Sequence, residues 1–214
     1  MTMPRAGGGA HAGVTGPGWP GASARLEGRR VALEPLAEPH APDLYAAAQD
    51  ERIWPWMQYD ASASPQAFGR FFGDALAAAR RGEEVPFAAV DLSTGHAVGS
   101  TRYMALAPEH LRLEIGWTWY SPQVWGTGLN VECKLLLLTH AFERLGARRV
   151  ELKTDERNER SRGAMLAFGA VFEGIHRKHM VTRDGGVRNT AWYSVTDDEW
   201  PAVRERLQAR LGER

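Results

Sequence analysis

The sequence contains a single cysteine, no long apolar run and no excess of either charge. Cys133 alone excludes an internal disulfide and fits a reducing compartment. No apolar run approaches the ~20 residues needed to span a membrane, and the first residues lack the apolar core of a secretory signal. The 26 basic and 26 acidic residues balance, which gives no general affinity for nucleic acid or acidic lipid. We therefore expect a soluble, cytoplasmic protein that binds neither nucleic acid nor membranes.

The chain is long enough for one sizeable core, because 214 residues correspond to one typical domain. Residues 1–23 are mostly Gly, Ala and Pro and offer little to bury, so we expect a disordered N-terminal tail. No internal repeat and no interdomain linker follows. The sequence therefore predicts one α/β domain over residues 24–214.

The middle of the chain combines a strand pattern, a glycine loop and a long apolar helix. Apolar and polar residues alternate over Leu111–Trp119, as in a strand with one buried face. The loop Gln123–Gly128 has two glycines, and the apolar run Leu129–Leu145 ends at Gly146, which is typical of a helix terminus. A helix start of this kind offers unpaired N–H groups and a positive dipole end to an anion such as a pyrophosphate.

Strand and helix patterns alternate along the rest of the chain. Before the central stretch they predict a strand in Ala24–Leu36, a helix over Pro42–Gln49, a helix from Ser64 to Gly82, and a hairpin of Val85–Leu92 with Ala97–Ala105. After it they predict a strand over Arg148–Thr154, a helix from Asn158 to Phe168, a hairpin of Val171–Val181 with Val187–Val195, and a last helix after Thr196.

The glycine loop does not by itself identify its ligand. A P-loop would end in Gly-Lys-Ser/Thr, whereas this loop continues Gly128-Leu129-Asn130. A dinucleotide-binding fingerprint needs a third glycine where Val131 stands. What remains is Gln-x-x-Gly-x-Gly between a strand and a helix, which resembles the acyl-CoA loop of the GNAT superfamily of N-acetyltransferases.

Further motifs occur in the order expected for that superfamily. They are Glu114-Ile-Gly-Trp117, Lys153-Thr-Asp-x-x-Asn158-x-x-Ser161 and Gly169-Ala-Val-Phe-Glu173-Gly174. Together with the loop they look like the RimJ/RimL-like branch, which acetylates the N-termini of ribosomal proteins. The resemblance covers roughly Arg25 to Leu211 and implies the GNAT fold. That fold has a single mixed, largely antiparallel central sheet flanked by helices, with a splayed parallel pair of strands that binds acyl-CoA.

The resemblance also implies which residues bind acetyl-CoA. The pantetheine would lie along the backbone of Trp117, Thr118, Trp119 and Tyr120. The pyrophosphate would lie on the loop and helix start, at Gln123, Val124, Trp125, Gly126, Thr127, Gly128, Leu129 and Asn130. The next helix would contribute Asn158, Ser161 and Phe168. Asn158 also fits a helix N-cap, and the glycines also fit a turn with positive φ.

Two residues are candidates for proton transfer, Ser161 and Glu114. Ser161 falls near the expected place of the CoA sulfur, although serine is also common at helix starts. Glu114 faces away from its neighbours Leu113 and Ile115, so it is either solvated or structural, or a base for the acceptor amine. Many GNAT enzymes carry a tyrosine acid four residues before the helix-ending glycine. This chain has Met165 there, and a thioether cannot donate a proton.

Other candidate residues have simpler explanations. His176 and His179 are three apart on a predicted strand, so we expect them on opposite faces and without a shared metal. The aromatic residues Trp54, Trp56 and Tyr59 lie in the loop where the family receives its acceptor, although they also fit a core. We predict substrate contact for these three aromatic residues and no metal site.

The expected function is transfer of an acetyl group from acetyl-CoA to a primary amine by direct attack in a ternary complex. The amine would be a protein N-terminal α-amine or a small-molecule amine, because no strong base is evident for a lysine. Two alternatives remain: a module that binds acyl-CoA without turnover, and an antibiotic or polyamine acetyltransferase. The balanced charges of residues 50–82 do not favour a polycationic acceptor. Relatives in the resembled branch are often dimers, and several tryptophans, Trp192 and Trp200 among them, lie in expected edge or terminal elements, so we predict a homodimer.

Overall fold

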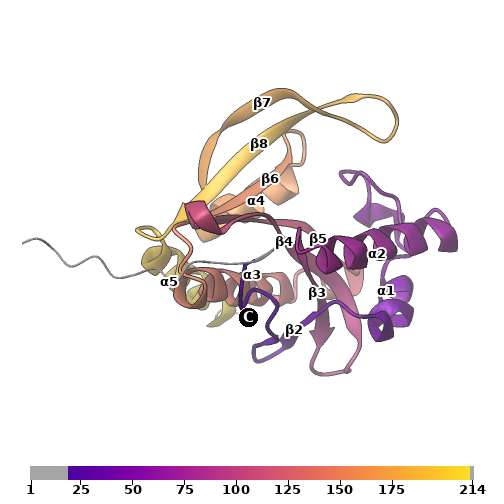
Figure 1. The fold of residues 1–214 in the computed structure, drawn as a ribbon, viewed down its shortest axis with the longest axis horizontal. Helices are drawn as coiled ribbons and strands as arrows, with labels where there is room; N and C mark the ends of the chain where they lie inside the picture. Colours follow the sequence, from indigo (N-terminus) through magenta and orange to yellow (C-terminus); the bar gives the residue numbers. More distant parts are fainter. Residues whose placement is uncertain (1–18, 213–214) are drawn as a thin grey trace, which may run out of the picture.

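The computed structural model describes residues 19–212, which form one eight-stranded sheet flanked by helices (Figure 1). The strands are β1 Leu26–Glu27, β2 Val31–Pro35, β3 Val85–Asp91, β4 Ala97–Ala107, β5 Arg112–Tyr120, β6 Arg149–Asp155, β7 Val171–Val181 and β8 Val187–Thr196. The helices are α1 Ala41–Ala47, α2 Pro65–Arg80, α3 Leu129–Thr139, α4 Glu159–Phe168 and α5 Trp200–Gly212. The predicted α/β class and order of elements are confirmed.

The sheet has the order β1-β2-β3-β4-β5-β6-β8-β7, and β5–β6 is its parallel pair. All its other neighbouring strands pair antiparallel. The parallel ladder joins Arg112–Glu114 to Arg149–Glu151 and goes no further, so the two strands separate beyond Glu114. The predicted mixed sheet with a splayed parallel pair is therefore confirmed.

Helices cover the two faces of the sheet in different places. Alternate residues of the central strands, such as Leu113 and Val150, share one core with Leu137 of α3 and Leu207 of α5. A second core forms where α1 and α2 pack on β3 and β4. In Figure 1 the β7–β8 hairpin arches away from the sheet toward the segment before α2. Arg183 in the hairpin turn makes that contact, because it donates to the Tyr59 carbonyl at 3.2 Å.

The N-terminal boundary differs from the prediction, because packing begins before residue 24. Trp19 and Ala22 are 8% and 0% exposed and belong to the larger core. The rest of the predicted tail, residues 1–18, lies outside the described residues. The predicted first strand is also two strands, β1 and β2. The turn between them is held by Glu132 of α3, which accepts from the N–H groups of Arg29 and Arg30 at 2.7 and 2.9 Å.

The predicted helix termini are confirmed, with one local change. The Ser64 side chain caps α2, the Asn158 side chain caps α4, and Gly169 ends α4 at φ 101°. The long helix is α-helical over Leu129–Thr139 and continues as a π-helical turn to Arg144. Periodicity over a long apolar run cannot reveal such a change in hydrogen bonding.

The prediction that His176 and His179 point to opposite faces is wrong. The pairing of β7 with β8 shifts between His176 and Met180, and Lys178 has φ 51°. This irregularity brings the two imidazole rings to 5.6 Å, both against Trp192. Within residues 19–212 no group of three or more His, Cys, Asp or Glu side chains is placed to hold a metal ion. In the same range no helix is long and apolar enough to cross a membrane.

Candidate functional site

A cavity of about 360 Å³ opens where β5 and β6 separate. Its walls come from β5, β6, the first turns of α3 and α4, the segment Arg52–Gln58 and the β7–β8 hairpin. Most of the residues that the resemblance assigns to the acetyl donor line it, namely Trp117, Thr118, Trp119, Tyr120, Trp125, Asn130, Asn158, Ser161 and Phe168. The other assigned loop residues, Gln123, Val124, Gly126, Thr127, Gly128 and Leu129, form the turn beside the cavity, outside its lining.

The glycine loop has a backbone that suits close approach of an anion. Gly126 has φ 79°, and a side chain there would meet open space. Gly128 has φ 93° and is the N-cap of α3, so the first amides of the helix face the loop. The Trp125 indole fixes the loop by donating to the Tyr120 carbonyl at 2.9 Å. These features fit the pyrophosphate of a CoA substrate.

Two arginines that the sequence did not single out surround Trp125. The Arg160 guanidinium lies 3.7 Å from the centre of the Trp125 ring, and that of Arg52 lies at 5.6 Å. Both arginines line the cavity beside the start of α3. They add positive charge where a phosphate group would lie. For Arg160, the sequence feature that could have indicated this role is a basic residue in the first helical turn after Asn158.

Lys134 is a buried amine inside the cavity wall. Its Nζ donates to the Thr118 hydroxyl at 3.1 Å, and that hydroxyl is 2.7 Å from the Thr101 hydroxyl. Burial lowers the pKa of Lys134 to about 8. This position could not be predicted from the sequence, because Lys134 is a single polar residue within an apolar helical run.

Ser161 lies at the donor side of the cavity, in the first turn of α4. Its backbone N–H donates to the Asn158 side chain at 3.1 Å, so Asn158 acts as the predicted N-cap and also lines the cavity. Within residues 19–212 the Ser161 hydroxyl has no hydrogen-bond partner, so it can bind a ligand. Met165 is 5% exposed and completes the apolar wall.

Glu114 lines the cavity. Of the alternatives predicted for it, a solvated side chain is wrong, whereas a structural role and a role as a base both fit its position. It is 1% exposed, and its Oε2 accepts from Lys153 Nζ at 2.7 Å. Burial raises the pKa of Glu114, while the charge of Lys153 opposes this effect. Gly116 leaves room beside it, because a Cβ there would lie 3.0 Å from Glu114 Oε1 and 2.5 Å from Met104 Sδ. Glu114 is therefore a buried carboxylate that faces the substrate space.

The three aromatic residues predicted to contact the acceptor have different positions. Trp54 is 0% exposed and donates to the Ala48 carbonyl, so direct contact with an acceptor is wrong for this residue. Tyr59 packs against Trp117 behind the cavity wall and is not part of the lining. Trp56 lines the cavity and is 37% exposed, with the Arg157 guanidinium 5.4 Å from its ring. The three aromatic residues of this loop therefore have three different environments. The sequence alone does not show which of them lines the cavity.

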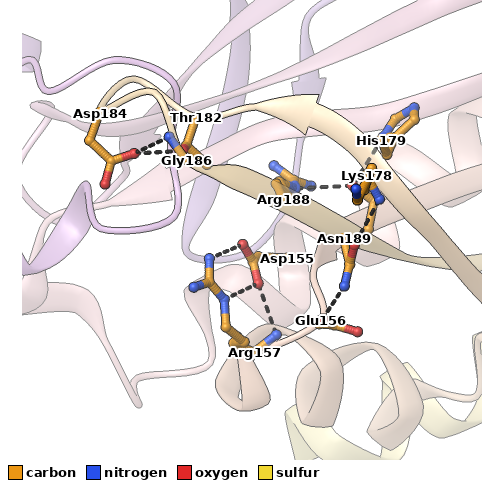
Figure 2. A network of polar contacts seen from close by, with 11 residues as sticks. Asp155, Glu156, Arg157, Lys178, His179, Thr182, Asp184, Gly186, Arg188 and Asn189 are labelled. Carbon is orange, nitrogen blue, oxygen red and sulfur yellow. Dashed lines mark hydrogen bonds and ion pairs between the residues drawn. The ribbon is translucent and has the colours of Figure 1, made fainter.

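The β7–β8 hairpin supplies the last wall of the cavity, with Arg188 and Met180. Figure 2 shows Arg188 and its polar neighbours. Arg188 donates from Nε to the Thr190 hydroxyl at 3.1 Å. Asp155 lies nearby and binds the Arg157 guanidinium through two hydrogen bonds of 2.9 and 2.8 Å. This bonding holds the pKa of Asp155 below its usual value. No role was predicted for Arg188, because it lies outside every motif identified in the sequence.

Comparisons with known proteins agree with this geometry. Residues 30–171 match the Acetyltransferase (GNAT) domain family. The crystal structure of a GCN5-related N-acetyltransferase from Brucella melitensis is similar, with a TM-score of 0.82 and 34% identity over 88% of this chain and 86% of that chain. The structure of Mycobacterium smegmatis RimJ in complex with CoA-disulfide has a TM-score of 0.74 over 88% of this chain and 95% of that one. At 21% identity that likeness shows the fold alone.

A curated relative matches part of the chain. The uncharacterized N-acetyltransferase YoaA of Bacillus subtilis is 30% identical over 102 residues. The match covers 48% of this chain and 56% of YoaA, so the chain spans little more than half the length of that relative. The family match itself extends over most of the chain, from β2 to the start of β7. The chain therefore belongs to the GNAT acetyltransferase family.

Proposed function

We propose that the protein is an acetyl-CoA-dependent N-acetyltransferase that acetylates a primary amine by direct attack in a ternary complex. One observation carries this proposal. A single cavity reaches from Asn130, at the start of α3, to Glu114, beyond which β5 and β6 separate. A donor on the glycine loop and an amine near Glu114 would therefore share one space, as direct transfer requires.

The donor would be held mainly by backbone. The pyrophosphate would lie on the amides at Gly126–Leu129, with Arg160 and Arg52 beside it. The pantetheine would follow the unpaired part of β5, residues 117–120. Acetyl-CoA supplies an activated thioester, and the role of the chain is to orient it and to exclude water.

Proton transfer would involve the two predicted side chains. Glu114 would accept a proton from the amine, directly or through water, and its raised pKa makes it a stronger base than an exposed glutamate. The Ser161 hydroxyl would protonate the leaving thiolate, in the absence of a tyrosine at Met165. No covalent acyl-enzyme is needed, because the amine reaches the donor within the same cavity.

The acceptor would be a protein N-terminal α-amine or a small-molecule amine. The motifs that resemble the RimJ/RimL-like branch support a peptide N-terminus. An α-amine, with a pKa near 8, is also partly neutral at pH 7 and needs little help from a base. We further propose a homodimer, which light scattering at micromolar concentration would test. We also propose a cytoplasmic location.

The direct test is purified protein mixed with acetyl-CoA and a panel of amines and peptides. Thiol release and the mass of the acetylated product are the readouts. We expect both with α-amines or small amines. Acetyl-CoA binding without thiol release from any acceptor would contradict the enzyme and support a module that binds acyl-CoA without turnover. Release with antibiotic amines or polyamines alone would favour the resistance-type alternative.

A further inference from the structure

Arg188 is a buried cation at the acceptor end of the cavity. It is 9% exposed and lines the cavity through its position on β8, opposite Met180 of β7. Its Nε donates to Thr190, which is fully buried. Within residues 19–212 Arg188 makes no ion pair. Figure 2 shows Arg188 near the Asp155–Arg157 pair, with no dashed line joining it to either residue.

Asp155 and Glu114 are the carboxylates whose negative charges act on Arg188, and both already bind other cations. Asp155 is held by Arg157, and Glu114 is held by Lys153. Neither carboxylate is therefore left to form an ion pair with Arg188. A buried charge without an ion-pair partner is unfavourable unless a ligand of opposite charge binds to it. Burial lowers the pKa of Arg188, which expresses the same unfavourable desolvation.

The position of Arg188 is well fixed for binding. The Thr190 hydroxyl bonds both Arg188 Nε and His179 Nδ1, at 3.1 and 3.0 Å. With Nε engaged, the two terminal nitrogens of the guanidinium remain for a planar, two-oxygen partner. A side chain held in place before binding loses little conformational entropy when the ligand arrives.

We propose that Arg188 binds a carboxylate of the acceptor, so that the preferred substrate is a primary amine that also carries a carboxylate. A free amino acid and a peptide N-terminus followed by an acidic side chain both have this chemistry. The carboxylate binds at Arg188 of β8 and the amine lies toward Glu114 of β5, which lines the same cavity. This inference rests on the proposed acetyl transfer and adds its substrate class.

The test uses pairs of amines that differ by one change, a carboxylate replaced by a carboxamide. One pair is an amino acid and its amide, and the other is a peptide with Asp in second position and its Asn counterpart. Binding is titrated by calorimetry in the presence of CoA, and KM and kcat are measured with acetyl-CoA. We expect the carboxylate member of at least one pair to bind about 10- to 100-fold more tightly, through KM rather than kcat. The responding pair identifies the source of the carboxylate.

Arg188→Gln should reduce the preference to nearly onefold, and Arg188→Lys should keep part of it, because the charge stays and the two-nitrogen fork is lost. The matched control is Arg177→Gln, an exposed arginine on β7 that should leave the preference unchanged. Thermal melts establish that each variant is folded. Equal binding of both members in the wild type, or an unchanged preference in Arg188→Gln, would overturn the proposal. Failure of the acetyltransferase itself is distinguishable, because it removes thiol release and leaves the binding ratio measurable.

Discussion

The proposed donor end and the proposed acceptor end of the cavity are built in different ways. The donor end comes mostly from one continuous segment, residues 117–130, and depends on backbone direction, two left-handed glycines and a helix start. The acceptor end comes from side chains of separate elements, namely Trp56, Met104, Glu114, Lys153 and Arg188. The first kind of site can be predicted from a short sequence motif, whereas the second forms only when the chain folds.

This difference also separates the roles of the two ends. A site made of backbone binds a constant chemical group and tolerates many side chains around it. A site made of side chains can discriminate between acceptors, because each charge or ring favours some ligands and disfavours others. Substitutions should therefore affect donor binding mainly through backbone shape, and acceptor choice mainly through individual side chains. The predictions below test that division, beginning with the largest effect.

Gly126→Val should weaken acetyl-CoA binding by about 100-fold or more, roughly 3 kcal/mol. The new side chain fills the space where phosphates would lie, and a β-branched residue is strained at φ 79°. Calorimetric titration with acetyl-CoA measures the change. The matched control is Gly95→Val, in the β3–β4 turn at φ 75° with open space around it, which carries the same strain far from the cavity. Native affinity in Gly126→Val would show that the loop does not bind the donor.

The fold and the residues that line the cavity next to the glycine loop could be predicted from the sequence because both depend on local signals. Caps at Ser64 and Asn158 and the glycine at 169 mark helix ends, and the alternation before the loop marks β5. The failures involve long-range contacts. Trp19 belongs to the same buried core as Phe142, which lies more than a hundred residues further along the chain. Arg188 joins the cavity through the sheet order, which no local pattern contains.

Ser161→Ala is the donor-end change that depends on a side chain, and it should lower turnover roughly tenfold to a hundredfold. A serine hydroxyl is a weak acid, so the effect should lie toward the low end of general acid catalysis. Affinity for acetyl-CoA should stay nearly unchanged, since the Asn158 cap bonds the backbone of Ser161 and not its hydroxyl. Single-turnover kinetics and titration separate the two quantities. If turnover stays at the wild-type rate, water protonates the thiolate and the donor end works through backbone alone.

Lys134→Met tests whether a buried charge at the donor end costs stability. The pKa of Lys134 is about 8 in the folded protein and 10.5 ordinarily, so the unfolded state binds more protons between these values. The stability of the wild type should therefore rise with pH through this window. At pH 7 the folded state carries the full cost of the buried charge, so the variant should be more stable by about 1–3 kcal/mol.

Urea unfolding from pH 7 to 10.5 measures this difference, which should shrink as pH rises. The control Lys178→Met removes an exposed lysine and should show no such trend. A constant difference across the range would mean that the stabilisation comes from packing of the methionine. In that case the buried charge of Lys134 does not lower the stability of the folded protein.

Glu114→Gln concerns the proposed acceptor end and should have the smallest effect on turnover, below the usual range for general base catalysis, because an α-amine is already partly neutral near pH 7. Below the raised pKa of Glu114 the wild-type carboxyl is protonated and accepts nothing, so the two proteins should converge. Above pH ~8 an α-amine is neutral without help, so they should converge again. The ratio of wild-type to variant turnover should therefore peak between these limits.

The exposed Glu109→Gln serves as the control. A ratio that stays flat from about pH 6 to 9 would mean that Glu114 holds Lys153 in place and transfers no proton, and the acceptor end would then select its amine by position and charge alone.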